Sequence, residues 1–138
     1  LSKVLDEYQS HLKNENKLII IIVTDGEPTN AFGNVDITEF KSCLANRPFI
    51  DRVFISIVAC TDDDSSIEYL NEWDRSIMNL DVVDDYRNER KEVRKVRGHS
   101  FAFSYGDFVV KSLVGCVDKK IDQLDESTRK KLECCSIS

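Results

Sequence analysis

The chain has 138 residues, of which 41% are hydrophobic and 32% are charged, and its formal net charge at pH 7 is −6. This length and hydrophobic content fit one domain with a core of its own and exclude an intrinsically disordered chain. The acidic excess argues against a general nucleic-acid-binding protein, because such proteins need basic side chains to neutralise phosphates. No run in the sequence approaches the roughly 20 apolar residues that a membrane-spanning helix requires.

Apolar residues recur at helical spacing in several segments, and two continuous β-branched runs are typical of strands that are buried on both faces. The predicted order is a helix over Ser2–Asn14, a strand over Leu18–Val23, a helix over Ile37–Asn46, a strand over Val53–Cys60, a helix from Asp64 or Ser65 to Met78, a strand over Leu80–Val83, a charged helix or loop over Tyr86–Arg97 and a helix over Asp107–Val117. This alternation predicts an α/β domain with a mostly parallel sheet, helices on both faces and Val53–Cys60 as the middle strand.

Five cysteines are present, an odd number without the paired spacing of a disulfide framework or a zinc site. Cys43, Cys60 and Cys116 lie in apolar patterns, which is typical of buried free thiols. We therefore expect reduced cysteines and a cytoplasmic location.

Acidic residues follow each predicted strand: Asp25 with Glu27, Asp62–Asp64, and Asp84 with Asp85. The carboxyl ends of parallel strands meet at one edge of a sheet, where α/β proteins place their working groups. These three acidic loops are therefore the candidate functional face. Helix N-caps and solvated loop acids are the alternative interpretation of the second and third loops.

The segment Leu18–Asn30, LIIIIVTDGEPTN, resembles the fourth strand and following loop of von Willebrand factor A-type (VWA) domains, where an apolar strand ends in Thr-Asp-Gly. The helices and strands that follow agree with this order, and Asn79–Asp118 is similar to the C-terminal region of uncharacterised eukaryotic, notably fungal, VWA proteins. The resemblance implies a VWA or Rossmann-like sheet of which residues 1–118 hold the last three strands. Residues 119–138 then form a polar C-terminal tail.

The VWA resemblance implies a protein-interaction module rather than an enzyme, with a metal-ion-dependent adhesion site for Mg²⁺. The main ligands of that site come from a D-x-S-x-S motif, whose nearest string here, Asp63–Ile67, has isoleucine for the second serine and follows a different strand. Asp25 is the residue that carries over, and in the family it often reaches the cation through water. The site is thus incomplete, and Mg²⁺ binding is expected of a complete domain and no tighter than millimolar in this chain.

In VWA domains the strand that Leu18–Val23 resembles pairs with a first strand, and this sequence has no counterpart of that strand. An apolar strand with one free edge tends to pair with another chain. We therefore expect Leu18–Val23 to pair with a second copy of the chain or with the N-terminal half of a VWA domain. The partner is expected to be a protein and not a nucleic acid.

An enzyme remains as an alternative, because Asp25-Gly26-Glu27-Pro28-Thr29 also resembles the D-x-D-x-T motif of haloacid dehalogenase-type phosphatases. That resemblance implies a Mg²⁺-dependent phosphatase with Asp25 as the nucleophile and Glu27 as the general acid. Thr61 and the pair Asp84-Asp85 match its later motifs. The lysine of the third motif has no counterpart, since the interval from Thr61 to Asp84 contains only Arg75 as a base.

The last four residues, Cys135-Ser136-Ile137-Ser138, fit the pattern for farnesylation of Cys135, and Cys134 beside it is a candidate for palmitoylation. The basic run Arg129–Lys131 precedes them. The motif predicts a lipid-modified tail and association with a membrane, for which one farnesyl chain gives only marginal binding.

We predict that the protein isolated from a eukaryotic cell carries a farnesyl group on Cys135. Intact-protein mass spectrometry should show the adduct in the native chain and its loss in Cys135→Ser. An unmodified mass for the native chain would contradict the prediction.

Overall fold

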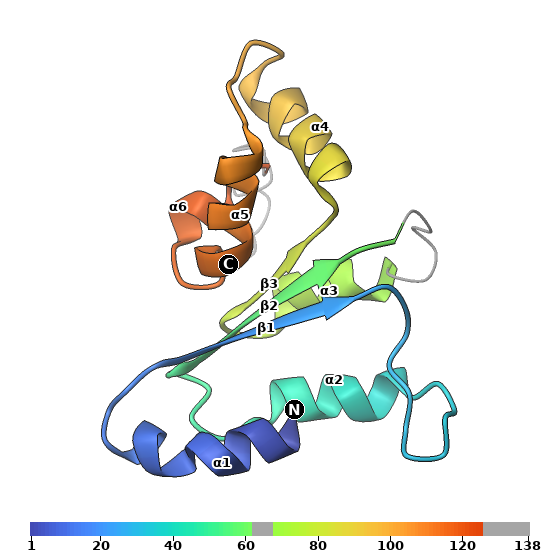
Figure 1. Cartoon of the computed structure of the whole chain (residues 1–138), viewed down its shortest axis with the longest axis vertical. Helices are drawn as coiled ribbons and strands as arrows, with labels where there is room; N and C mark the ends of the chain where they lie inside the picture. The colour runs from blue at the N-terminus through green and yellow to red at the C-terminus, as the bar shows by residue number, and fades with distance from the viewer. Residues whose placement is uncertain (62–67, 126–138) are drawn as a thin grey trace, which may run out of the picture.

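The computed structural model describes residues 1–61 and 68–125, which form a three-stranded sheet with helices on both of its faces (Figure 1). The elements in chain order are α1 (Ser2–Lys13), β1 (Leu18–Thr24), α2 (Ile37–Ala45), β2 (Val53–Ala59), α3 (Glu68–Ser76), β3 (Leu80–Val83), α4 (Tyr86–Arg97), α5 (Tyr105–Val114) and α6 (Lys119–Asp122). The α/β class predicted from the sequence is therefore confirmed. In the described ranges no helix is both long and apolar enough to cross a membrane.

The sheet has the order β1-β2-β3, and both pairings are parallel. Leu18 pairs with Val53 at the start of β1, and Leu80 pairs with Ile55 at the start of β3. The prediction that the middle strand lies between two parallel neighbours is thus confirmed. All seven residues of β2 are buried, as expected of a strand with neighbours on both edges and helices on both faces.

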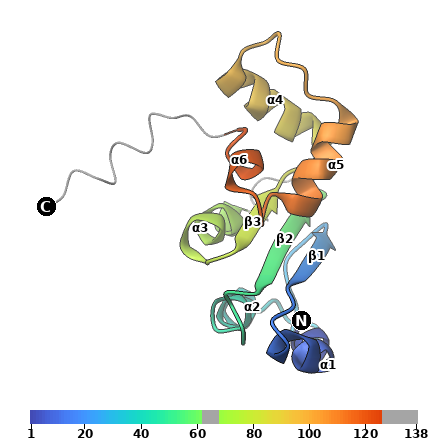
Figure 2. The same ribbon diagram turned by 90° about the vertical axis from the view of Figure 1, so that its left-hand side faces the viewer.

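One face of the sheet carries the main hydrophobic core. Its centre is formed by Ile55 and Ile57 of β2, which are fully buried, and Trp73 of α3 lies against the same core. Figure 2 shows α1 and α2 together below the sheet, with α3 beside β3. The remaining buried members of this core are Leu5, Leu12, Leu44, Val53, Ala59, Leu70, Ile77 and Leu80.

The opposite face is covered by α5, which packs on β2. Residues paired in register in a parallel sheet point to the same face, so Ile21, Ser56 and Asp81 form one row across β1, β2 and β3. Gly115, directly after α5, lies against Asp81, which places this row on the α5 face. Helices α4 and α5 are joined by aromatic contacts of Tyr86 with Phe103 and Phe108.

A buried arginine joins the strand ends to α2. Arg47 is 4% exposed, and its guanidinium donates hydrogen bonds to the carbonyls of Leu44, Val53 and Met78. These carbonyls lie where α2 ends, where β2 begins and just before β3. Arginine suits the position because its fixed fork of donors can satisfy several buried carbonyl groups at once.

The structure corrects one detail of the cysteine prediction. Cys43, Cys60 and Cys116 are all free thiols, but only Cys116 is buried, whereas Cys43 is half-buried and Cys60 is exposed. Cys60 lies one residue beyond the end of β2, so it leaves the covered part of the sheet. The acidic loop Asp62–Asp64 and the tail with Cys134 and Cys135 lie outside the described residues.

Candidate functional site

The loop after β1 leaves its acidic side chains in solvent. Asp25 and Glu27 are both exposed, while the Thr24 hydroxyl donates a hydrogen bond of 2.9 Å to the Gly26 carbonyl and tightens the turn. The structure therefore places the Thr-Asp-Gly sequence at the carboxyl end of a parallel strand, as the sequence predicts.

The acids after β3 have structural roles. Asp85 is the N-cap of α4, and its carboxylate accepts hydrogen bonds from the backbone N–H groups of Arg87, at 2.7 Å, and Asn88, at 3.4 Å. The helix-cap interpretation is thus confirmed for Asp85. β1 and β3 are separated by β2, and the Asp25 and Asp85 carboxylates are not brought together in a metal-binding group of the described residues.

An acidic cluster that the sequence analysis did not identify lies at the β3 side of the sheet. Asp74 of α3, Asp81 of β3 and Asp122 of α6 each bring a carboxylate oxygen within 4.8 Å of the others. Asp74 also accepts a 3.2 Å hydrogen bond from the backbone N–H of Val82. This bond covers the outer edge of β3, and the helices around the cluster gather beside that strand (Figure 2).

The ammonium of Lys111 in α5 interacts electrostatically with Asp81 and Asp74 of this cluster. Its side chain is 1% exposed, and its ammonium nitrogen lies 2.7 Å from Glu89 Oε1 of α4 and 3.3 Å from Asp125 Oδ2. An ion pair buried to this extent loses the hydration of both charges, so it persists only where several partners surround the charge. Burial alone would lower the pKa of Lys111, but Glu89, Asp125 and Asp81 raise it above its usual value, so the ammonium keeps its proton.

The acidic side chains near Lys111 hold their protons more strongly than acids in water. Burial raises the pKa of Asp81 to about 8, with Lys111 opposing the rise and Asp122 and Asp74 adding to it. Burial and the neighbouring Asp122 raise the pKa of Asp74 to about 6. The pKa of Glu89 is raised to about 7, because its desolvation outweighs its attraction to Lys111. The single positive charge of Lys111 therefore does not balance the negative charge of the surrounding carboxyl groups when all of them are ionised.

The backbone at the end of α5 is shaped to admit the Asp81 carboxylate. A Cβ atom on Gly115 would lie 2.0 Å from Asp81 Oδ2 and 2.8 Å from the Lys111 carbonyl oxygen. Real Cβ atoms do not approach other atoms so closely, so glycine is required here for close packing, although its backbone is helical.

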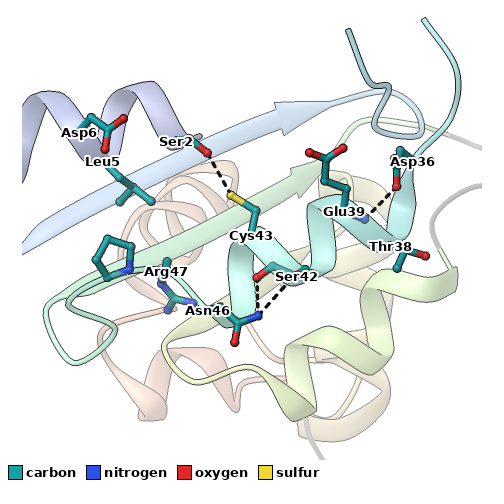
Figure 3. Close-up of a pocket in the computed structure, with 11 residues that line it drawn as sticks. Ser2, Leu5, Asp6, Asp36, Thr38, Glu39, Ser42, Cys43, Asn46 and Arg47 are labelled. Carbon is teal, nitrogen blue, oxygen red and sulfur yellow. Dashed lines mark hydrogen bonds between the residues drawn. The ribbon is translucent and has the colours of Figure 1, made fainter. Parts of the chain in front are cut away.

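A separate hollow of about 670 Å³ lies between α1 and α2 (Figure 3). Several of its polar side chains are engaged within the fold: Cys43 contacts the Ser2 hydroxyl at 3.5 Å, and the Asp36 carboxylate accepts the Glu39 N–H as the N-cap of α2. These contacts hold α1 and α2 in place and define no ligand site by themselves.

The outer edge of β1 is the second candidate site. Leu18 N–H donates to Arg52 and the Thr24 carbonyl accepts from Cys60, so the even-numbered residues of β1 direct their backbone groups toward β2. In a parallel ladder the odd-numbered residues then direct theirs outward. No strand in the described ranges pairs with this edge.

Apolar side chains lie along this unpaired edge of β1. Ile19, Ile21 and Val23 project onto the α5 face of the sheet, and they are 44%, 41% and 67% exposed. Helix α5, on the same face, leaves Val110 and Leu113 50% and 43% exposed. We call Ile19, Ile21 and Val23, with the outward backbone groups of the same residues, the open edge.

Comparison of the chain with protein-family models, with curated proteins and with solved structures found no match. The interpretation of function therefore depends on the motif residues and on the geometry described above.

The missed cluster had a weak signal in the sequence. Asp81 lies within the apolar run Leu80–Val83, and Lys111 lies within the apolar run of α5. A lone charge in an apolar run predicts either a solvent-facing position or a buried ionic contact. Asp74 lies in the preceding helix, and Asp122 is separated from Asp81 by α4 and α5, so sequence spacing gives no means of joining the three.

We predict that Gly115→Ala lowers the free energy of unfolding by about 1–3 kcal/mol, because the added methyl group must displace the Asp81 carboxylate or α5. Urea denaturation measures the change. The matched control is Gly106→Ala in α5, where an added Cβ would meet only the Ser104 hydroxyl at 3.5 Å. An equal effect of the two substitutions would contradict the packing argument.

The raised pKa of Glu89 predicts an unusual dependence of stability on pH. Its folded-state pKa of about 7 lies above the usual glutamate pKa of 4.5, so the folded chain binds more protons between these two values. The free energy of unfolding should therefore fall as the pH rises from about 4.5 to about 7. Urea denaturation across this range should show the fall in the native chain and a flatter profile in Glu89→Gln. Stability that increases over this range would contradict the prediction.

Proposed function

We propose that the chain is a VWA-type protein-interaction module that binds another polypeptide along the open edge of β1. The observation that carries this proposal is the coincidence, on one strand, of unpaired backbone groups and an exposed apolar row. A partner strand would satisfy those backbone groups and would bury Ile19, Ile21 and Val23 at the same time.

The fold supplies further support for a VWA-type module. The Thr-Asp-Gly sequence follows the edge strand, two more parallel strands continue the sheet from it, and the free edge is the one at which the VWA resemblance expects the absent first strand. A polypeptide that adds a strand at this edge therefore extends the sheet in the direction in which a VWA domain continues.

Asp25 contributes an exposed carboxylate beside the carboxyl end of the open edge. No second acid of the described loops joins it in a metal-binding group. We therefore assign Asp25 to the rim of the protein-binding surface, where a charge influences which partner is bound. The phosphatase alternative gains no support, because the carboxylate of Asp85 is held by the N-terminus of α4.

The second copy of the chain is the first partner to test, because two open edges can pair with each other. We predict that the native chain self-associates at micromolar concentration and that Ile21→Lys keeps it monomeric, since a lysine on an edge strand opposes pairing. Light scattering or sedimentation measures the mass. Phe32→Lys is the control, because Phe32 is 90% exposed but lies in the loop before α2.

We expect Phe32→Lys to associate to the same extent as the native chain, because its open edge is intact. A native chain that stays monomeric at high micromolar concentration, or an Ile21→Lys variant that associates normally, would contradict pairing between open edges.

A further inference from the structure

Three carboxylates from separate elements converge next to β3. They belong to Asp74, Asp81 and Asp122, and one oxygen of each lies within 4.8 Å of the other two. Two of the side chains are half-buried, so the group can be reached from solvent, whereas Asp81 is 1% exposed.

Two buried oxygens on the same face of the sheet have no hydrogen-bond partner in the described structure. One is Oδ2 of Asp81, which belongs to the cluster, and the other is Oγ of Ser56, which is 0% exposed. Ser56 is the in-register neighbour of Asp81 on β2, so both side chains leave the sheet on the same face and on adjacent strands about 4.8 Å apart. Buried polar atoms without a partner are rare, and an unfilled ion site is one of the explanations that they call for.

The Asp81 and Asp122 carboxyls face each other closely enough to interact by hydrogen bonding. Two carboxylates are both acceptors, so such a contact requires either a proton or a cation between them. Lys111 does not fill that place, because its ammonium contacts Glu89 and Asp125. A cation among the three carboxylates is the alternative to a shared proton, and it would also engage the Asp81 oxygen that lacks a hydrogen-bond partner.

We propose that Asp74, Asp81 and Asp122 form a binding site for one hard divalent cation of the size of Ca²⁺. Carboxylate oxygens are the ligands that Ca²⁺ and Mg²⁺ prefer, and no nitrogen or sulfur ligand belongs to the group. Two ligands on opposite sides of Ca²⁺ lie about 4.6–5.2 Å apart, whereas those of Mg²⁺ lie about 4.0–4.2 Å apart. Ligand atoms within 4.8 Å of one another lie inside the span of the ligands of one Ca²⁺ ion.

The proposed site is distinct from the adhesion site that the VWA resemblance implies. Asp25 lies beyond the carboxyl end of β1, whereas Asp81 lies near the start of β3, two strands away. The cation would join α3, β3 and α6 through one carboxylate of each element. Its effect is therefore expected on stability as well as on binding.

The experiment uses the full chain after removal of metal ions with EDTA and dialysis. Calorimetric titration with CaCl₂ and with MgCl₂ measures affinity, and thermal unfolding with and without Ca²⁺ measures the stabilisation that binding produces. Tb³⁺, which occupies Ca²⁺ sites, gives a third readout, because the only tryptophan, Trp73, directly precedes Asp74 and can sensitise its luminescence.

The test variants are Asp122→Asn and Asp74→Asn, and Asp25→Asn is the control. Asparagine keeps the size of each side chain, and at position 74 it keeps an oxygen for the Val82 N–H. Circular dichroism verifies that each variant is folded. We expect saturable Ca²⁺ binding that is tighter than Mg²⁺ binding, a loss of about tenfold or more in both test variants, and unchanged binding in the control.

Absence of saturable Ca²⁺ binding and of Tb³⁺ luminescence at millimolar concentration would overturn the proposal and would indicate that shared protons neutralise the cluster. Binding that survives in Asp122→Asn and Asp74→Asn but is lost in Asp25→Asn would also overturn it, because the cation would then occupy the loop after β1.

Discussion

The burial of β2 on both faces is the constraint on which the rest of the structure depends. A strand that is apolar throughout and flanked by two parallel neighbours must be covered above and below, and the chain meets this requirement with α1, α2 and α3 on one side and α5 on the other. Covering the second face brings Lys111 of α5 over the sheet near Asp81 of β3. The buried charges are thus a consequence of how α5 closes the core.

The two edges of the sheet differ, because a helix protects β3 whereas β1 is open, and this difference connects structure with function. At β3 the Asp74 carboxylate accepts the Val82 N–H, so α3 protects the edge. At β1 the outward backbone groups have no partner strand in the described structure, and the side chains beside them are apolar. Proteins generally block such an edge with charges, bulges or a covering segment. Its retention on β1 favours a role in binding another polypeptide.

The proposed cation site and the open edge would then have separate roles. The acidic cluster lies at the protected side of the sheet, where a cation would hold α6 and α3 against β3 and relieve repulsion among the aspartates. The open edge lies two strands away and is free to meet a partner. A cation bound at the acidic cluster would stabilise the sheet that carries the open edge, without itself contacting the partner.

The sequence was sufficient to predict the α/β class, the three strands and their parallel order, because apolar runs and turn residues are local signals. It was also sufficient to place Asp25 after a strand, since Thr-Asp-Gly follows a β-branched run directly. Helix ends were less accurate: α5 begins at Tyr105, two residues before the predicted Asp107, because Ser104 and Asp107 form a capping box.

The acidic cluster was not predictable, because it depends on how α3, β3 and α6 pack together. The sequence placed Asp74 in a helix and Asp122 in the polar tail, and only the fold brings them to Asp81. For Asp84 and Asp85 the sequence suggested a site instead of missing one. Their position after a strand suggested a functional face, but Asp85 caps α4. Local patterns thus identified elements, whereas the sites required tertiary contacts.

Hydrogen exchange of the β1 amides tests the central claim, an open edge that binds a polypeptide, most directly. In a dilute monomer we predict fast exchange at Ile19, Ile21 and Val23 and slow exchange at Ile20 and Ile22, which donate to β2. At concentrations where the chain associates, all five amides should be protected. Slow exchange of the odd-numbered amides in the dilute monomer, or their continued fast exchange after association, would contradict the account.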